Sequence, residues 1–154
     1  MSATLHTHAD DHDFSALATT PVVWLALASL GVGGLCTVLT GLQTVTSIRL
    51  DGLWEAMPFA QLGLGALAIL IAFIVGRMRL WATHVGLVVS VLLTIVNGAW
   101  SIFSVGGGVF SLIALMAAGA SCVSVPFVAL SIAPCRRATE ARERLRKDGL
   151  DPGF

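Results

Sequence analysis

Charged residues are scarce in this chain and absent from most of its middle. Asp, Glu, Lys and Arg make up 12% of the sequence, and none occurs in residues 15–48 or 56–76. Across residues 80–134 only His84 can titrate near neutral pH. Carriers coupled to protons or cations normally place an acidic or basic side chain inside their membrane spans. The lack of such side chains in these stretches argues against that class of transporter.

Cysteine and histidine are also too few, or wrongly spaced, for common redox sites. Cys36, Cys122 and Cys135 form no Cys-x-x-Cys pair, which argues against a disulfide framework and against quinone-linked thiol chemistry. Haem held between helices usually needs two axial ligands, and His84 is the only histidine in the apolar stretches. No obvious general base lies there either. We therefore expect no enzyme activity and no cofactor bound by this chain alone.

Long apolar runs are what the sequence has in abundance. The mean hydropathy is +0.87 and 56% of the residues are hydrophobic, well above the values of soluble domains. A helix of about 20 apolar residues spans the hydrocarbon core of a bilayer. The runs predict an all-α integral membrane protein, with a four-helix transmembrane domain in residues 21–134. The expected spans are residues 21–46, 58–76, 80–104 and 109–133.

Lys and Arg near the ends of the spans predict the orientation, because cytoplasmic ends collect these residues. Eight of them fall on one side of the four spans, and only Arg49 falls on the other. We therefore expect a multi-pass protein of the cell membrane with both termini in the cytoplasm. Residues 1–20 would form an acidic, histidine-containing tail, and residues 135–154 a basic helix and tail.

The basic C-terminal segment has the pattern of a short helix. Glu140 with Arg144, and Glu143 with Lys147, are favourable i, i+4 pairs, and Gly149 is placed to end the helix. Basic side chains next to a membrane attract anionic headgroups, although they can also serve only to set orientation. The candidate headgroup contacts are Arg136, Arg137, Arg142 and Arg144.

Hydroxyl and amide side chains recur at a spacing of three or four residues in the first and third spans. The candidates are Thr37, Thr40, Thr44, Thr94, Asn97 and Ser101. This spacing keeps each set on one helix face, and the orientation places both sets in the outer half of the membrane. They are either packing seams, with hydroxyls bonded to their own helix, or the lining of an outward-facing pocket. Asn97 is the residue whose amide is hardest to satisfy within one helix.

Histidines provide two further candidate sites. In an extended chain His6, His8 and His12 point the same way and could bind a metal such as zinc, unless the tail is simply solvated. His84 lies about one turn inside the cytoplasmic edge of its span. It could contact a haem or pigment if a partner supplied the second ligand, or it could be neutral and bonded to a carbonyl.

These patterns favour a non-enzymatic structural or accessory subunit of a membrane complex. Its partners would be membrane lipids and other membrane subunits or copies of itself, with no nucleic acid. A first alternative is a pore or carrier for a lipid or neutral solute that uses the hydroxyl-lined pocket. A second alternative is an accessory subunit of a redox or light-harvesting complex that contacts a cofactor through His84.

Overall fold

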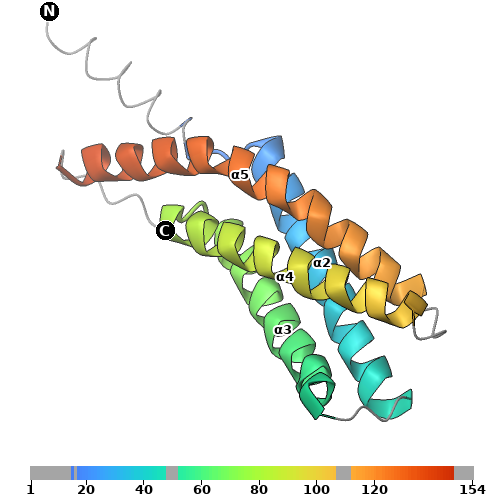
Figure 1. The fold of residues 1–154 in the computed structure, drawn as a ribbon. Helices are drawn as coiled ribbons and strands as arrows, with labels where there is room; N and C mark the ends of the chain where they lie inside the picture. Colours follow the sequence, from blue (N-terminus) through green and yellow to red (C-terminus); the bar gives the residue numbers. More distant parts are fainter. Residues whose placement is uncertain (1–14, 16, 48–51, 107–111, 148–154) are drawn as a thin grey trace, which may run out of the picture.

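The computed structural model describes residues 15, 17–47, 52–106 and 112–147. In these ranges the chain forms four long α-helices and one short 3-10 helix, with no strand (Figure 1). The elements are α2 (Pro21–Ser47), η1 (Gly52–Ala56), α3 (Met57–Val75), α4 (Leu80–Gly106) and α5 (Leu112–Lys147).

All four α-helices are long and apolar enough to cross a membrane. The shortest, α3, has 19 residues, which at 1.5 Å per residue span about 28 Å, close to the thickness of a hydrocarbon core. The prediction of four apolar spans in an all-helical chain is confirmed. The first three spans agree with the helices to within two residues, while the expected start of the fourth at residue 109 lies outside the described ranges.

The helices are joined in antiparallel succession and each packs mainly against two others. Helix α2 lies along α3 and α5, and α4 lies along α5 and, over a shorter length, α3. Helices α2 and α4 touch only briefly across the bundle. The order α2, α3, α4, α5 therefore closes on itself, with the first and last helices as neighbours.

Glycines allow α2 and α3 to approach very closely. A Cβ atom at Gly34 would lie 2.7 Å from the carbonyl oxygen of Gly65, and a Cβ atom at Gly65 would lie 2.7 Å from that of Gly34. Neither position can hold a larger residue without separating the helices. Such contacts are typical of helices packed in lipid, where small residues at the interface increase van der Waals contact.

The outside of the bundle is covered by large apolar side chains. Phe73, Val88, Ile95 and Leu130 are each between 60% and 62% exposed. Water would oppose a surface of this kind, whereas lipid tails tolerate it. The surface and the four long helices together indicate a multi-pass membrane protein.

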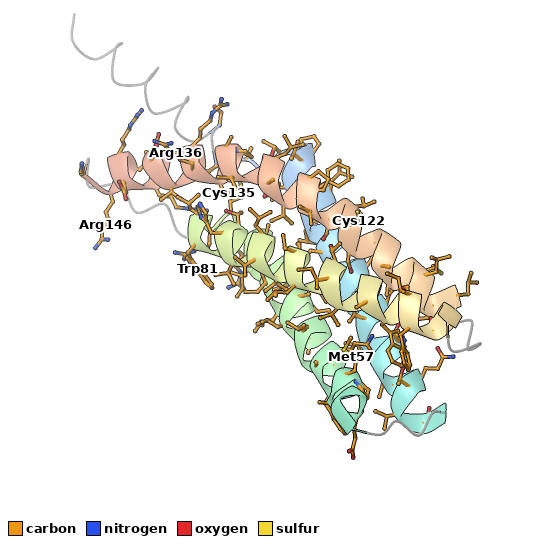
Figure 2. All side chains as sticks on the ribbon, viewed as in Figure 1. Met57, Trp81, Cys122, Cys135, Arg136 and Arg146 are labelled. Atoms are coloured by element: carbon orange, nitrogen blue, oxygen red, sulfur yellow. The ribbon has the colours of Figure 1, made fainter. Side chains whose placement is uncertain are left out.

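The basic C-terminal segment is helical up to Lys147, and it continues the fourth long helix directly. Helix α5 continues without interruption through Pro126 and Pro134 to Lys147. A proline inside a helix removes one backbone hydrogen bond and bends the helix, and α5 bends along its length (Figure 1). Cys135 lies near the bend (Figure 2).

The buried face of α5 explains why the helix continues beyond the apolar region. Ser131, Cys135, Ala138, Ala141 and Leu145 are buried in succession. Their spacing of three or four residues keeps one face of the basic segment against the bundle. The apolar run ends near residue 133, as expected for the fourth span, but the helix does not end there.

Candidate functional site

The hydroxyls of the two predicted stripes are mostly satisfied by their own helices. Thr37, Thr40 and Thr44 are buried in α2, with exposures of 0–3%, and Thr94 and Ser101 of α4 are half-buried. In each case the hydroxyl donates to the carbonyl oxygen four residues earlier, at 2.6–2.9 Å. Ser101 also lies 3.2 Å from the carbonyl oxygen of Ala114 in α5. These contacts are those expected of packing seams.

Asn97 is the exception, because its side chain joins three helices. Its Nδ2 atom donates to Thr37 Oγ1 of α2 at 2.8 Å and to Ser121 Oγ of α5 at 2.9 Å. Both hydroxyls donate their own hydrogens to helix carbonyls, Thr37 to Gly33 and Ser121 to Ala117. Their lone pairs are therefore free to accept the two amide hydrogens, and the three side chains form a connected network.

Three buried amide atoms have no hydrogen-bond partner among the described residues. They are Oδ1 of Asn97 and both Oε1 and Nε2 of Gln61. Gln61, in α3, is fully buried, and its Cβ would lie 3.3 Å from a Cβ added at Gly41 of α2. An amide buried without a partner is costly, above all in lipid.

The structure places one predicted residue in a contact that the sequence analysis missed. Asn97 was expected to need a neighbour, and Ser121 is that neighbour in α5. In the sequence, Ala117–Ser121 is a run of small residues. A serine on the buried face of an apolar helix was the available signal, but a hydroxyl that can bond to its own helix does not reveal its second partner.

A second polar site lies at the opposite end of the bundle, where the turn between α3 and α4 meets α5. Arg142 of α5 donates from Nη1 to the carbonyl oxygen of Met78 at 3.0 Å and from Nη2 to that of Arg77 at 3.1 Å. Met78 has a φ angle of 52° and is 2% exposed. The guanidinium group thus satisfies carbonyls that follow the end of α3, at a turn with a left-handed, non-glycine residue.

The surroundings of Arg142 disfavour the positive charge of its own guanidinium group. Burial lowers the pKa of Arg142, the positive charge of Arg79 lowers it further, and Cys135 partly opposes this shift. Burial also raises the pKa of the Cys135 thiol to about 11, against an opposite effect of Arg142. Arginine still remains charged in proteins, and no salt bridge to Arg142 is present among the described residues.

The other predicted headgroup arginines do not share the position of Arg142. Arg136 pairs with Glu140, with an Nε–Oε1 distance of 3.0 Å and side chains 72% and 49% exposed. Such an exposed pair contributes little stability. Arg137 and Arg144 are also exposed. Arg142 also lines a cavity at this end of the bundle.

Among the candidate histidines, His84 is the one that lies within the described residues. His84 is exposed, and its Nδ1 lies 2.9 Å from the carbonyl oxygen of Leu80 one turn earlier. His6, His8 and His12 lie outside the described residues. Within the ranges that the structure describes, no group of three His, Cys, Asp or Glu residues could hold a metal ion.

Comparison with known proteins adds no relative. The chain matches no protein-family profile, no curated protein and no solved structure.

Proposed function

We propose that this protein is a non-enzymatic structural or accessory subunit of a membrane complex, packed against other membrane proteins or copies of itself. The observation that supports the proposal is that the polar side chains of the two stripes form their hydrogen bonds inside the helix bundle. The hydroxyls of α2 and α4 bond within the bundle, and Asn97 joins α4 to α2 and α5. These groups contribute to packing and are not directed at a substrate.

The proposed setting is the cell membrane, with both termini in the cytoplasm. The end of the bundle that carries Arg77, Arg79, Arg136 and Arg142 would be the cytoplasmic end. The Asn97 network would then lie in the outer half of the membrane. A cysteine-accessibility scan with a membrane-impermeant reagent, applied to single cysteines placed at the two termini, tests this orientation.

A stripe of small residues on the outward face of α5 supports the packing proposal. Its members are Gly119, Cys122, Pro126, Ala129 and Ala133, all exposed. A Cβ atom added at Gly119 would meet nothing within 4 Å. Small residues at this spacing allow another helix to approach closely in lipid. We therefore assign this stripe, called the α5 outer stripe, as the contact surface for a partner helix.

Cross-linking through Cys122, labelled in Figure 2, tests the assignment. Copper phenanthroline applied to the native membrane should join Cys122 to a second copy or to a cysteine of another subunit. Cys122→Ser should abolish the product, whereas Cys135→Ser should leave it, because Cys135 is 0% exposed and has a pKa of about 11. Mass measurement of the gently extracted complex should then identify the partner. A single polypeptide without a partner in that measurement, and no Cys122 product, would contradict the proposal.

The second candidate function is a pore or carrier for a lipid or neutral solute. It is supported by the buried amide atoms of Gln61 and Asn97 that have no hydrogen-bond partner in the described part of the chain. A monomer extracted with one bound lipid or solute would favour it. In that case Asn97→Leu should leave the protein folded and remove the bound molecule.

A further inference from the structure

A cavity lies at the arginine-rich end of the bundle. Its volume is about 430 Å³, within the range of small-molecule sites. Leu17 and Thr19, which precede α2, line one part of it. The turn formed by residues 76–79 and the side chain of Arg142 line the remainder. Three separate parts of the chain therefore meet around it.

The lining is strongly positive. Three of its seven residues are Arg77, Arg79 and Arg142, and none of the described residues that line it is acidic. The ion pair between Arg136 and Glu140 lies on an exposed face of α5 and does not involve these three arginines. The positive charge of Arg79 acts on Arg142, so an anion bound in the cavity would offset the repulsion between these like charges.

Two of the arginines are held in place by other contacts. Both terminal nitrogens of Arg142 donate to backbone carbonyls of the turn, while its Nε is buried and has no partner among the described residues. The guanidinium carbon of Arg77 lies 5.0 Å from the centre of the Phe73 ring. A site whose charges are already positioned loses less entropy when a ligand binds.

We infer that this cavity binds a phosphate group, carried either by an anionic lipid headgroup or by a soluble phosphate compound. Arginine is well suited to this ligand, because its planar guanidinium group forms short, charge-assisted hydrogen bonds with phosphate oxygens. The hydroxyl of Thr19 adds a neutral donor. The site differs from the predicted headgroup contacts, since it uses Arg77 and Arg79 in place of Arg136, Arg137 and Arg144. It does not depend on the proposed role as a subunit, because a monomer could also bind phosphate.

The test uses the full chain in uncharged detergent at constant ionic strength. One series adds inorganic phosphate, and a second adds phosphatidic acid, with diacylglycerol as its phosphate-free control. The measurements are the unfolding temperature and the mass of retained ligand. A bound ligand should raise the unfolding temperature saturably. Stabilisation by inorganic phosphate would indicate a soluble ligand, and stabilisation by phosphatidic acid alone would indicate a headgroup.

Arg79→Gln is the decisive variant, because the side chain is exposed and only the backbone carbonyl of Arg79 takes part in the hydrogen bonds at the start of α4. It should weaken phosphate affinity about tenfold. Arg137→Gln removes the same charge outside the cavity and should change the affinity less than about twofold at this ionic strength. Arg77→Gln provides a second cavity variant if Arg79→Gln does not fold. Equal losses in the cavity and control variants, or no saturable response to either phosphate source, would overturn the inference.

Discussion

The two ends of the bundle satisfy their polar groups in different ways. Near the α2–α3 connection, threonine hydroxyls donate to carbonyls of their own helix, as Thr40 does to Cys36. At the arginine-rich end, Arg142 reaches from α5 to the carbonyls of Arg77 and Met78. The first kind of contact forms whenever the helix forms, and the second forms only when α5 is docked. Polar side chains in the same protein can therefore form bonds within one helix or bonds that join different parts of the fold, which we call tertiary links.

Asn97 brings one tertiary link into the hydroxyl-rich region. Its two donated bonds reach α2 and α5, while its Oδ1 and the whole amide of Gln61 remain without a partner among the described residues. We therefore rank three side chains by how much each one should contribute to the free energy of unfolding. Arg142 comes first, Asn97 second and Gln61 last.

Arg142→Ala should have the largest effect on stability. It removes two charge-assisted hydrogen bonds, so the carbonyl oxygens of Arg77 and Met78 lose their side-chain donor. These carbonyls belong to a turn in which Met78 has a left-handed backbone conformation. Hydrogen bonds to charged groups contribute about 1.5–3 kcal/mol, so a loss of about 2 kcal/mol in the free energy of unfolding is expected at this half-exposed site. Unfolding by SDS in mixed micelles measures it.

Arg137→Ala is the matched control for Arg142→Ala, since it removes the same charge from an exposed position on the same part of α5. It should change the free energy of unfolding by less than about 0.5 kcal/mol. If the two variants lose equal stability, the bonds from Arg142 to the turn do not hold α5 in place.

The sequence predicts the spans well and the tertiary links poorly. Composition and length are enough for α2, α3 and α4, because only a helix satisfies its backbone in lipid. Counting arginines by side treats Arg142 and Arg137 alike, although one faces the turn and the other faces outward. That difference depends on the continuation of α5 through Pro134, which a count of arginines does not reveal.

In the candidate site, too, positions on one helix are predictable from the sequence, whereas contacts between helices are not. The 3–4 spacing puts Thr37 and Asn97 each on one face of its helix, and both side chains are buried in the structure. It does not show that Ser121 completes the network, because spacing within a helix gives no register between helices. The arginine cavity was missed for the same reason, as Thr19, Arg79 and Arg142 come from three distant parts of the chain.

Asn97→Leu should have the second largest effect. Hydrogen bonds between membrane helices average about 0.6 kcal/mol and reach about 1.7 kcal/mol, and Asn97 makes two of them. Removing its unpaired Oδ1 offsets part of the loss, so we expect about 1 kcal/mol in SDS titration. Thr40→Val, which removes only a bond within α2, should cost less than about 0.5 kcal/mol.

A double-mutant cycle with Ser121→Ala checks the origin of the Asn97 effect. If the hydrogen bond between the two side chains carries the stability, the double variant should lose less than the sum of the two single variants. Additive losses would mean that Asn97 acts through packing alone. An unchanged stability combined with loss of a bound lipid or solute would instead support the carrier function.

Gln61→Leu should have the smallest effect and the opposite sign. Its amide is fully buried and has no partner in the described part of the chain, so an apolar side chain of similar length removes a desolvation cost without breaking a protein hydrogen bond. The gain should be only about 0.5 kcal/mol, because the unfolded chain in a membrane also finds partners for its amides. A loss of more than about 1 kcal/mol in the same SDS titration would show that Gln61 has a partner in the folded protein. Such a partner would be a residue outside the described ranges, a second helix bundle or a ligand, and the extracted mass would distinguish the last two, which support the two proposed functions.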